Sequence, residues 1–188
     1  MADEIARRLV HASGTGVPAL YLLDLTDWRT VQYLLVAGAG IALALEVIRL
    51  VVGLDWAIYD RLTREYEQEN LAGYALYFLS AAVVGLLAPV HVAIPAILML
   101  TIGDPISGLL GSGSLTKQTY VLLAMFGVCT GIASFFVGWL PAVLGGLAAT
   151  AADGLKPVIA GYVIDDNLTI PPAAAVAMLA GIEILTAM

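Results

Sequence analysis

The sequence has little charge and almost no cysteine. Among its 188 residues are one Cys, eight Lys or Arg and fifteen Asp or Glu, which gives a formal net charge of −7. The lone Cys129 excludes an internal disulfide, and because it lies in an apolar run we expect it to be a small buried hydrophobic side chain. The negative net charge argues against a nucleic acid as a partner.

Apolar residues are abundant instead. They make up 61% of the chain, compared with about 45–50% in soluble domains. Most are gathered in runs that approach the roughly 20 residues a helix needs to cross a bilayer. Since the polar segments between the runs are short, residues 1–188 are predicted to form a single, all-α, polytopic membrane domain. The start, MADEIARRLV, lacks a small-residue cleavage site, so we expect a retained end and not a signal peptide.

About seven membrane spans are predicted, the first marginal and the fourth broken. The fourth is expected to break at Gly103-Asp104-Pro105, because proline disfavours a helical conformation at the preceding residue and suits the first turn of a new helix. Residues 142–164 are compatible with one kinked helix or with a helix followed by a loop. The predicted spans are Val10–Leu25, Val31–Gly53, Leu71–Pro89, Val92–Ile102 with Pro105–Leu110, Tyr120–Leu140, Ala142–Ala152 and Pro172–Met188.

The basic residues predict the orientation, since cytoplasmic loops of membrane proteins carry an excess of Lys and Arg. With Arg7 and Arg8 inside, residues 54–70, 103–119 and 153–171 also lie inside, and seven of the eight basic residues fall on or near that face. The polar clusters of interest belong to the same segments. We therefore expect them to converge at the cytoplasmic face of the plasma membrane or an equivalent membrane, with the N-terminus inside.

The stretch Thr101–Lys117, TIGDPISGLLGSGSLTK, is the main candidate for a functional site. Asp104 would cap a short helix at the predicted break, and a carboxylate at membrane depth is usually there for function. It is a candidate ligand for a divalent cation, while the positive end of the short helix would face a phosphate. The alternative is an acid that merely caps a helix.

A glycine- and serine-rich stretch follows and ends at a lysine, which would face phosphate oxygens together with backbone N–H groups. The stretch lacks G-x-x-x-x-G-K-[ST], so it is not the common P-loop. Its candidate phosphate-binding residues are Gly108, Gly111, Ser114 and Lys117.

Two further polar clusters are candidates for the same site. Asp165-Asp166-Asn167 precedes the last span and would complete a metal shell or position a hydroxyl, although helix capping in a solvated loop fits equally well. Near the N-terminus, Arg7 and Arg8 match an anchor for anionic headgroups. His11 would bind phosphate or accept a proton. From the residues alone, anchoring is the better interpretation of this segment.

Two acids inside the apolar segments have less specific roles. Glu46 and Arg49 lie three residues apart, which places them on one helix face and predicts a pair that fixes helix packing. Asp153, at the end of the sixth segment, is ambiguous between such a role and chemistry.

In order along the chain, these motifs resemble the CTP-dependent lipid kinases, the family of dolichol kinase, phytol and farnesol kinases and the CTP-using diacylglycerol kinase. The resemblance implies that the protein transfers a phosphoryl group from CTP to a dolichol- or polyprenol-like alcohol at the cytoplasmic face, using Mg²⁺ or another divalent cation. The expected partners are this long-chain alcohol and membrane lipids. The motifs are RRLVH (Arg7–His11), Glu46 with Arg49, GDPISGLLG (Gly103–Gly111), Lys117 and DNLTIP (Asp166–Pro171).

In such a reaction, one carboxylate, Asp104 or Asp166, would accept the hydroxyl proton. The chain departs from the family pattern where a glutamate is usual near the end of the sixth segment, since the nearest acid is Asp153, and no acid follows Lys117 in QTYVLLAMFG. Two other functions stay open: a lipid cytidylyltransferase, and a small transporter or scaffold that uses the broken helix for passage. The resemblance implies that Asp104 and Asp166 bind the metal and that Arg7, Arg8 and His11 belong to the same site. The residues that it implies for nucleotide binding are Asp104, Asp166, Asn167 and Lys117.

Overall fold

The computed structural model describes residues 2–53, 67–68, 70–111, 117–155, 157–159 and 162–188. Over these ranges the chain is helical apart from turns and one pair of two-residue antiparallel strands. The helices are α1 (Ala2–Ser13), α2 (Gly16–Leu22), α3 (Trp28–Val47), the π-helical η1 (Ile48–Val52), α5 (Gly73–Leu87), α6 (Val90–Leu98), the π-helical η3 (Met99–Gly103), α7 (Asp104–Leu110), α8 (Thr119–Ser134), α9 (Trp139–Gly154) and α10 (Asp166–Thr186), and the strands are β1 (Val158–Ile159) and β2 (Tyr162–Val163).

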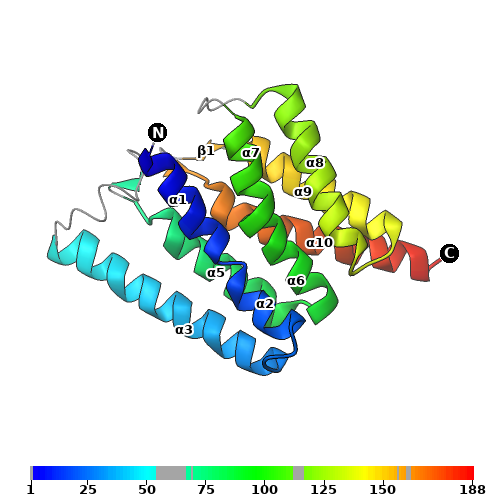
Figure 1. Ribbon diagram of the computed structural model, residues 1–188, viewed down its shortest axis with the longest axis horizontal. Helices are drawn as coiled ribbons and strands as arrows, with labels where there is room; N and C mark the ends of the chain where they lie inside the picture. Colours follow the sequence, from blue (N-terminus) through cyan, green and yellow to red (C-terminus); the bar gives the residue numbers. More distant parts are fainter. Residues whose placement is uncertain (1, 54–66, 69, 112–116, 156, 160–161) are drawn as a thin grey trace.

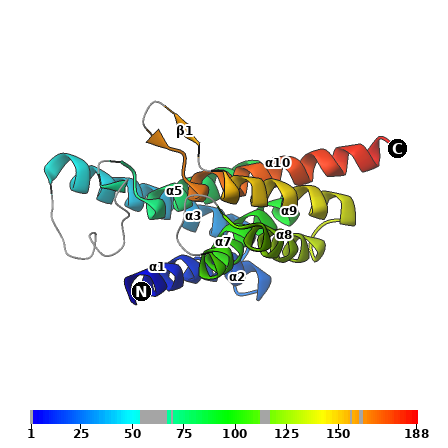
Figure 2. The ribbon, with the colours of Figure 1, turned by 90° about the horizontal axis from the view of Figure 1, so that it is seen from above.

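Helix α10 runs through the middle of the bundle, with α9 packed on one side and α5 on another (Figure 1). Helix α8 packs on α9, and α3 packs on α5. The core lies between α5, α6, α8 and α10 and contains Ala81, Ile97, Met125, Cys129 and Met178. Cys129 is buried as predicted. The β1–β2 hairpin stands out from the helical body close to the start of α10 (Figure 2).

Three helices are long and apolar enough to cross a bilayer: Trp28–Val52, Val90–Leu110 and Asp166–Thr186. This agrees with a helical membrane protein. A bundle of seven spans is not confirmed, because the apolar helices Gly73–Leu87 and Thr119–Ser134 are shorter. The Val90–Leu110 helix is largely enclosed by the others, whereas most of the Trp28–Val52 helix is exposed. An exposed apolar face of that length is suited to contact with lipid.

The predicted break in the fourth span is wrong. Gly103 and Asp104 both have right-handed helical dihedral angles, so Asp104 lies inside a helix that continues from Val90 to Leu110. The N–H of Asp104 bonds to the carbonyl of Met99, five residues earlier. This π turn relieves the clash that Pro105 would cause with a normal helical turn and tolerates its missing N–H. There is therefore no new helix end here to face a phosphate.

The last helix begins earlier than predicted, at Asp166 and not at Pro172. Asp165 caps it by accepting the N–H of Asn167 at 2.9 Å. Pro171 has no N–H to donate to the Asn167 carbonyl, which in a regular helix would be its partner. The Ser80 hydroxyl donates to that carbonyl instead, at 2.6 Å. Before α10, residues 142–154 belong to α9 and the strands β1 and β2 follow, so the described part of residues 142–164 is a helix followed by a non-helical stretch and not one kinked helix.

The backbones of helices α9 and α10 approach each other closely at Gly181. A Cβ at that position would lie 2.7 Å from the Cα of Pro141 and 3.0 Å from its nitrogen. Since backbone atoms cannot rotate away, we expect Gly181→Ala to lower the free energy of unfolding by about 1–3 kcal/mol. Thermal unfolding of the purified protein in detergent measures the change.

Gly127→Ala in α8 is the matched control, because a Cβ at Gly127 meets no atom within 4 Å. It changes the same residue type in a helix without adding a clash, so its midpoint should stay the same or rise slightly. Equal losses in both variants would contradict the close approach.

Candidate functional site

Three carboxylates from three helices meet in the fold. Asp104 of α7, Asp153 of α9 and Asp166 of α10 each place one oxygen within 4.8 Å of the other two. Asp153 and Asp166 are buried, and Asp104 is half-buried. Carboxylates held this close repel one another and are costly to bury without a compensating cation. Because Mg²⁺ and similar ions prefer oxygen ligands, the cluster has the donor set of a divalent metal site.

Lys117 and Ser107 hold Asp153 in place. The Lys117 ammonium donates to Asp153 Oδ1 at 2.5 Å and to the Ser107 hydroxyl at 2.9 Å. The Ser107 hydroxyl in turn donates to Asp153 Oδ2 at 2.7 Å. Ser107 follows Asp104 by three residues, so α7 turns both side chains to the same face. Charge-assisted bonds of this kind fix the carboxylate and offset one of the three negative charges.

Helix α1 lies against α7 and brings His11 to the cluster (Figure 1). His11 Nε2 is 4.0 Å from Asp104 Oδ2, and its ring centre is 5.7 Å from that of Tyr77. The Tyr77 hydroxyl donates to the carbonyl of Gly14 at 3.2 Å. These contacts hold the end of α1 beside the acidic cluster.

Arg8 lies one helical turn before His11 and packs on α7. Its guanidinium is 3.5 Å from the Pro105 carbonyl, and it fills the space above Gly108, where a Cβ would lie 1.4 Å from Nη1. A Cβ at Gly108 would therefore displace the Arg8 guanidinium from its place on α7. Gly108, which the sequence predicted to bind phosphate, lies inside α7 and is covered by Arg8.

The amide of Asn167 is buried next to Asp166. Its Nδ2 donates to Asp165 Oδ1 at 2.5 Å. Asn167 is only 5% exposed, and its Oδ1 has no hydrogen-bond partner in the part of the chain that the structure describes. A buried amide oxygen without a donor is costly, so this atom is a further candidate ligand for a cation or a bound polar group.

The Glu46–Arg49 pair forms as predicted and fixes packing. Arg49 donates to both carboxylate oxygens of Glu46, at 3.0 and 2.6 Å. Glu46 also accepts the N–H of Ala72 at 2.9 Å and the Tyr74 hydroxyl. The pair thus fastens the start of α5 to the end of α3. Arg49 donates in addition to the carbonyls of Glu67, Gln68 and Asn70.

Among the residues predicted from sequence, the structure brings Asp104 and Asp166 together. His11 lies beside Asp104, and Lys117 forms an ion pair with Asp153, the third acid of the cluster. Gly111 directly follows α7. Ser114 lies outside the described residues, and of Arg7 only its place in α1 is described.

The sequence left two site residues unassigned. Asp153 was ambiguous, and Ser107 was not considered at all. A signal existed for each: Asp153 is an acid at the end of an apolar segment, and Ser107 shares a helix face with Asp104.

A divalent cation held by the cluster would compete with Lys117 for Asp153. Lys117→Met removes a positive charge from beside the cluster, so we expect the affinity for Mn²⁺ to rise by about tenfold or more. Mn²⁺ titration followed by electron paramagnetic resonance measures this affinity. Lys117→Arg keeps the charge and is the control. A weaker affinity in Lys117→Met would mean that Lys117 positions Asp153 for the cation and does not compete with it, and an unchanged affinity would mean that no cation binds beside Asp153.

Comparisons with protein-family models, with curated proteins and with solved structures find no match to this chain. The fold and the site define a helical protein with three candidate membrane spans and a buried three-carboxylate cluster. Any assignment of chemistry therefore depends on this geometry and on the sequence motifs.

Proposed function

We propose that this protein is a membrane phosphotransferase that moves the γ-phosphoryl group of CTP to the hydroxyl of a long-chain isoprenoid alcohol, dolichol-like by preference. The observation that carries the proposal is the cluster of Asp104, Asp153 and Asp166 with Lys117 bound to one of its members. Phosphoryl transfer needs little covalent chemistry from a protein. It depends on positioned cations around the phosphate oxygens, and this cluster has the groups for that task.

The three carboxylates would hold the divalent cation, which supplies charge neutralisation at the phosphate oxygens when bound. Lys117 has three N–H donors, of which two are directed to Asp153 and Ser107 in the described contacts. The third is suited to a phosphate oxygen of the nucleotide. The ammonium would therefore stabilise charge on the transferred group while it orients a metal ligand.

The proton of the acceptor hydroxyl needs a base within reach. Asp104 is the least buried of the three acids, and His11 lies 4.0 Å from it. These two residues are the candidate proton acceptors, since both lie on the side of the cluster where α1 packs. The end of the bundle that holds the acidic cluster would lie at the cytoplasmic face, where CTP is available.

The test is a transfer assay with purified protein, Mg²⁺ and CTP labelled at the γ-phosphate. The acceptors are a panel of prenols, phytol and diacylglycerol, and ATP is the competing donor. Label in a prenol, lost with EDTA or in Asp104→Asn, is the expected result. Incorporation of α-label and not γ-label means cytidylyl transfer. A protein that consumes no CTP with any acceptor contradicts enzymatic function and favours a transporter or scaffold.

A further inference from the structure

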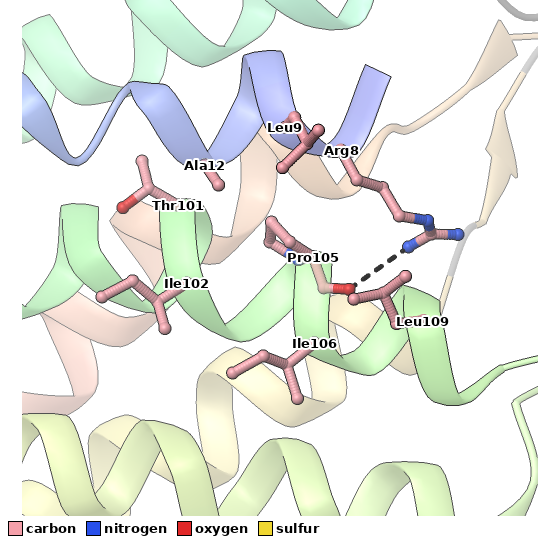
Figure 3. A pocket seen from close by; sticks show the side chains of 8 residues that line it. All are labelled: Arg8, Leu9, Ala12, Thr101, Ile102, Pro105, Ile106 and Leu109. Carbon is pink, nitrogen blue, oxygen red and sulfur yellow. Dashed lines mark hydrogen bonds between the residues drawn. The ribbon is translucent and has the colours of Figure 1, made fainter. Parts of the chain in front are cut away.

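A cavity of about 250 Å³ lies between α1 and the η3–α7 segment (Figure 3). Its wall is almost entirely apolar, with Leu9 and Ala12 from α1 and Ile106 and Leu109 from α7. Leu9 is 66% exposed and Leu109 is 64% exposed, so the cavity opens to the surroundings between them. Arg8 also lines the cavity, and among the described residues of the lining it is the only charged one.

Helix α7 separates this cavity from the carboxylates. Ile102, Ile106 and Leu109 follow a helical spacing and line the cavity, whereas Asp104 and Ser107 lie on other faces of the same helix. Helix α1 also contacts both places. Arg8 lines the cavity, and His11, one turn later, lies 4.0 Å from Asp104. The cavity and the acidic cluster therefore share two helices, α1 and α7.

We infer that this cavity binds the apolar chain of the acceptor alcohol, with the end that carries the hydroxyl directed to Arg8 and His11. The inference depends on the proposed function, which requires an acceptor hydroxyl beside Asp104. The nearly apolar wall suits a hydrocarbon chain and disfavours a ribose or triphosphate, whose polar groups would lose water without gaining partners. The opening lies between two helices, so a chain enters laterally from the bilayer.

The positive charge of Arg8 favours a ligand whose polar end becomes a phosphate. The product of the proposed reaction is a lipid phosphate, and a guanidinium pairs with phosphate oxygens through parallel N–H bonds. Arg8 borders the cavity one turn before His11, whose Nε2 lies 4.0 Å from Asp104 Oδ2. The headgroup of an anionic phospholipid would pair with Arg8 too, and the experiment below distinguishes a phospholipid from a prenol.

Photolabelling tests the occupant directly. A prenol that carries a diazirine in its chain is incubated with the protein in detergent, without CTP, and the labelled residues are mapped by mass spectrometry. We expect label on α1 and on residues 102–109, displaced by unlabelled prenol. Label spread over the exposed face of α3, or displaced by anionic phospholipid and not by prenol, overturns the inference.

A kinetic variant gives the second test. Ala12→Trp fills the cavity and should raise KM for a long-chain prenol by about tenfold, while kcat changes less than twofold. Ala37→Trp, at an exposed alanine of α3, is the matched control and should leave KM unchanged. An active Ala12→Trp enzyme with unchanged KM overturns the inference alone. Wild-type protein that transfers no phosphate overturns the proposed function, and photolabelling still decides whether a chain occupies the cavity.

Discussion

Asp153→Asn is expected to lower kcat of the proposed phosphoryl transfer by about 10²–10³-fold or more. The substitution removes one of three charges that would hold the divalent cation, and it removes the partner that orients the Lys117 ammonium. Asparagine has nearly the same shape, and its oxygen still accepts the Ser107 hydroxyl, so the helix packing should persist. The affinity for Mn²⁺, measured by electron paramagnetic resonance, should fall together with activity.

The matched control for this variant is Asp24→Asn. Asp24 lies in the turn between α2 and α3, has a φ of 53° and is exposed. Asparagine tolerates this left-handed conformation, so the control changes the same charge without strain. It should keep both Mn²⁺ affinity and transfer rate. Full activity in Asp153→Asn with an unchanged thermal midpoint would remove Asp153 from the site.

The convergence of the polar segments was predictable from the sequence. Apolar runs alternate with polar segments, so successive polar segments are expected at opposite ends of a bundle. Segments on the same side then hold Asp104, Lys117 and Asp166. The structure brings these residues to one cluster, and the distribution of basic residues had placed them on one side.

The π turn before Pro105 was not predictable from local rules, because the surroundings decide it. Thr101 and Gly103 are buried, and a Cβ at Gly103 would lie 2.8 Å from the Cys129 sulfur. A helix end at this depth would leave backbone N–H and C=O groups without partners in apolar surroundings. Widening the helix by one residue costs less than ending it. The burial of this segment therefore outweighs the preference of Pro105 for the start of a new helix.

The role of Asp153 was equally hidden, since it depends on contacts between distant segments. Its partners Lys117 and Ser107 lie 36 and 46 residues away in sequence. Neither spacing follows a helical period, and no motif joins them. By contrast, Glu46 and Arg49 are three residues apart, and the sequence predicted their pairing correctly.

Arg49→Met is expected to lower the free energy of unfolding by about 3–5 kcal/mol, because it leaves a buried carboxylate without its cation. Glu46 is 1% exposed, and Arg49 provides two of its hydrogen bonds. The variant also removes the donor for three carbonyls of the segment that leads to α5. Thermal or denaturant unfolding in detergent measures the loss. Arg29→Met, at an exposed position at the other end of α3, should change stability by no more than about 0.5 kcal/mol.

The double variant Glu46→Leu with Arg49→Met separates the cost of a buried charge from the loss of the carbonyl contacts. Removing both charges relieves the unpaired carboxylate, so the double variant should be more stable than Arg49→Met alone. It should not regain wild-type stability, because the N–H of Ala72 and the carbonyls of the segment stay without their partners. If the double variant is no more stable than Arg49→Met, then the carbonyl contacts, and not the charge on Glu46, account for the loss.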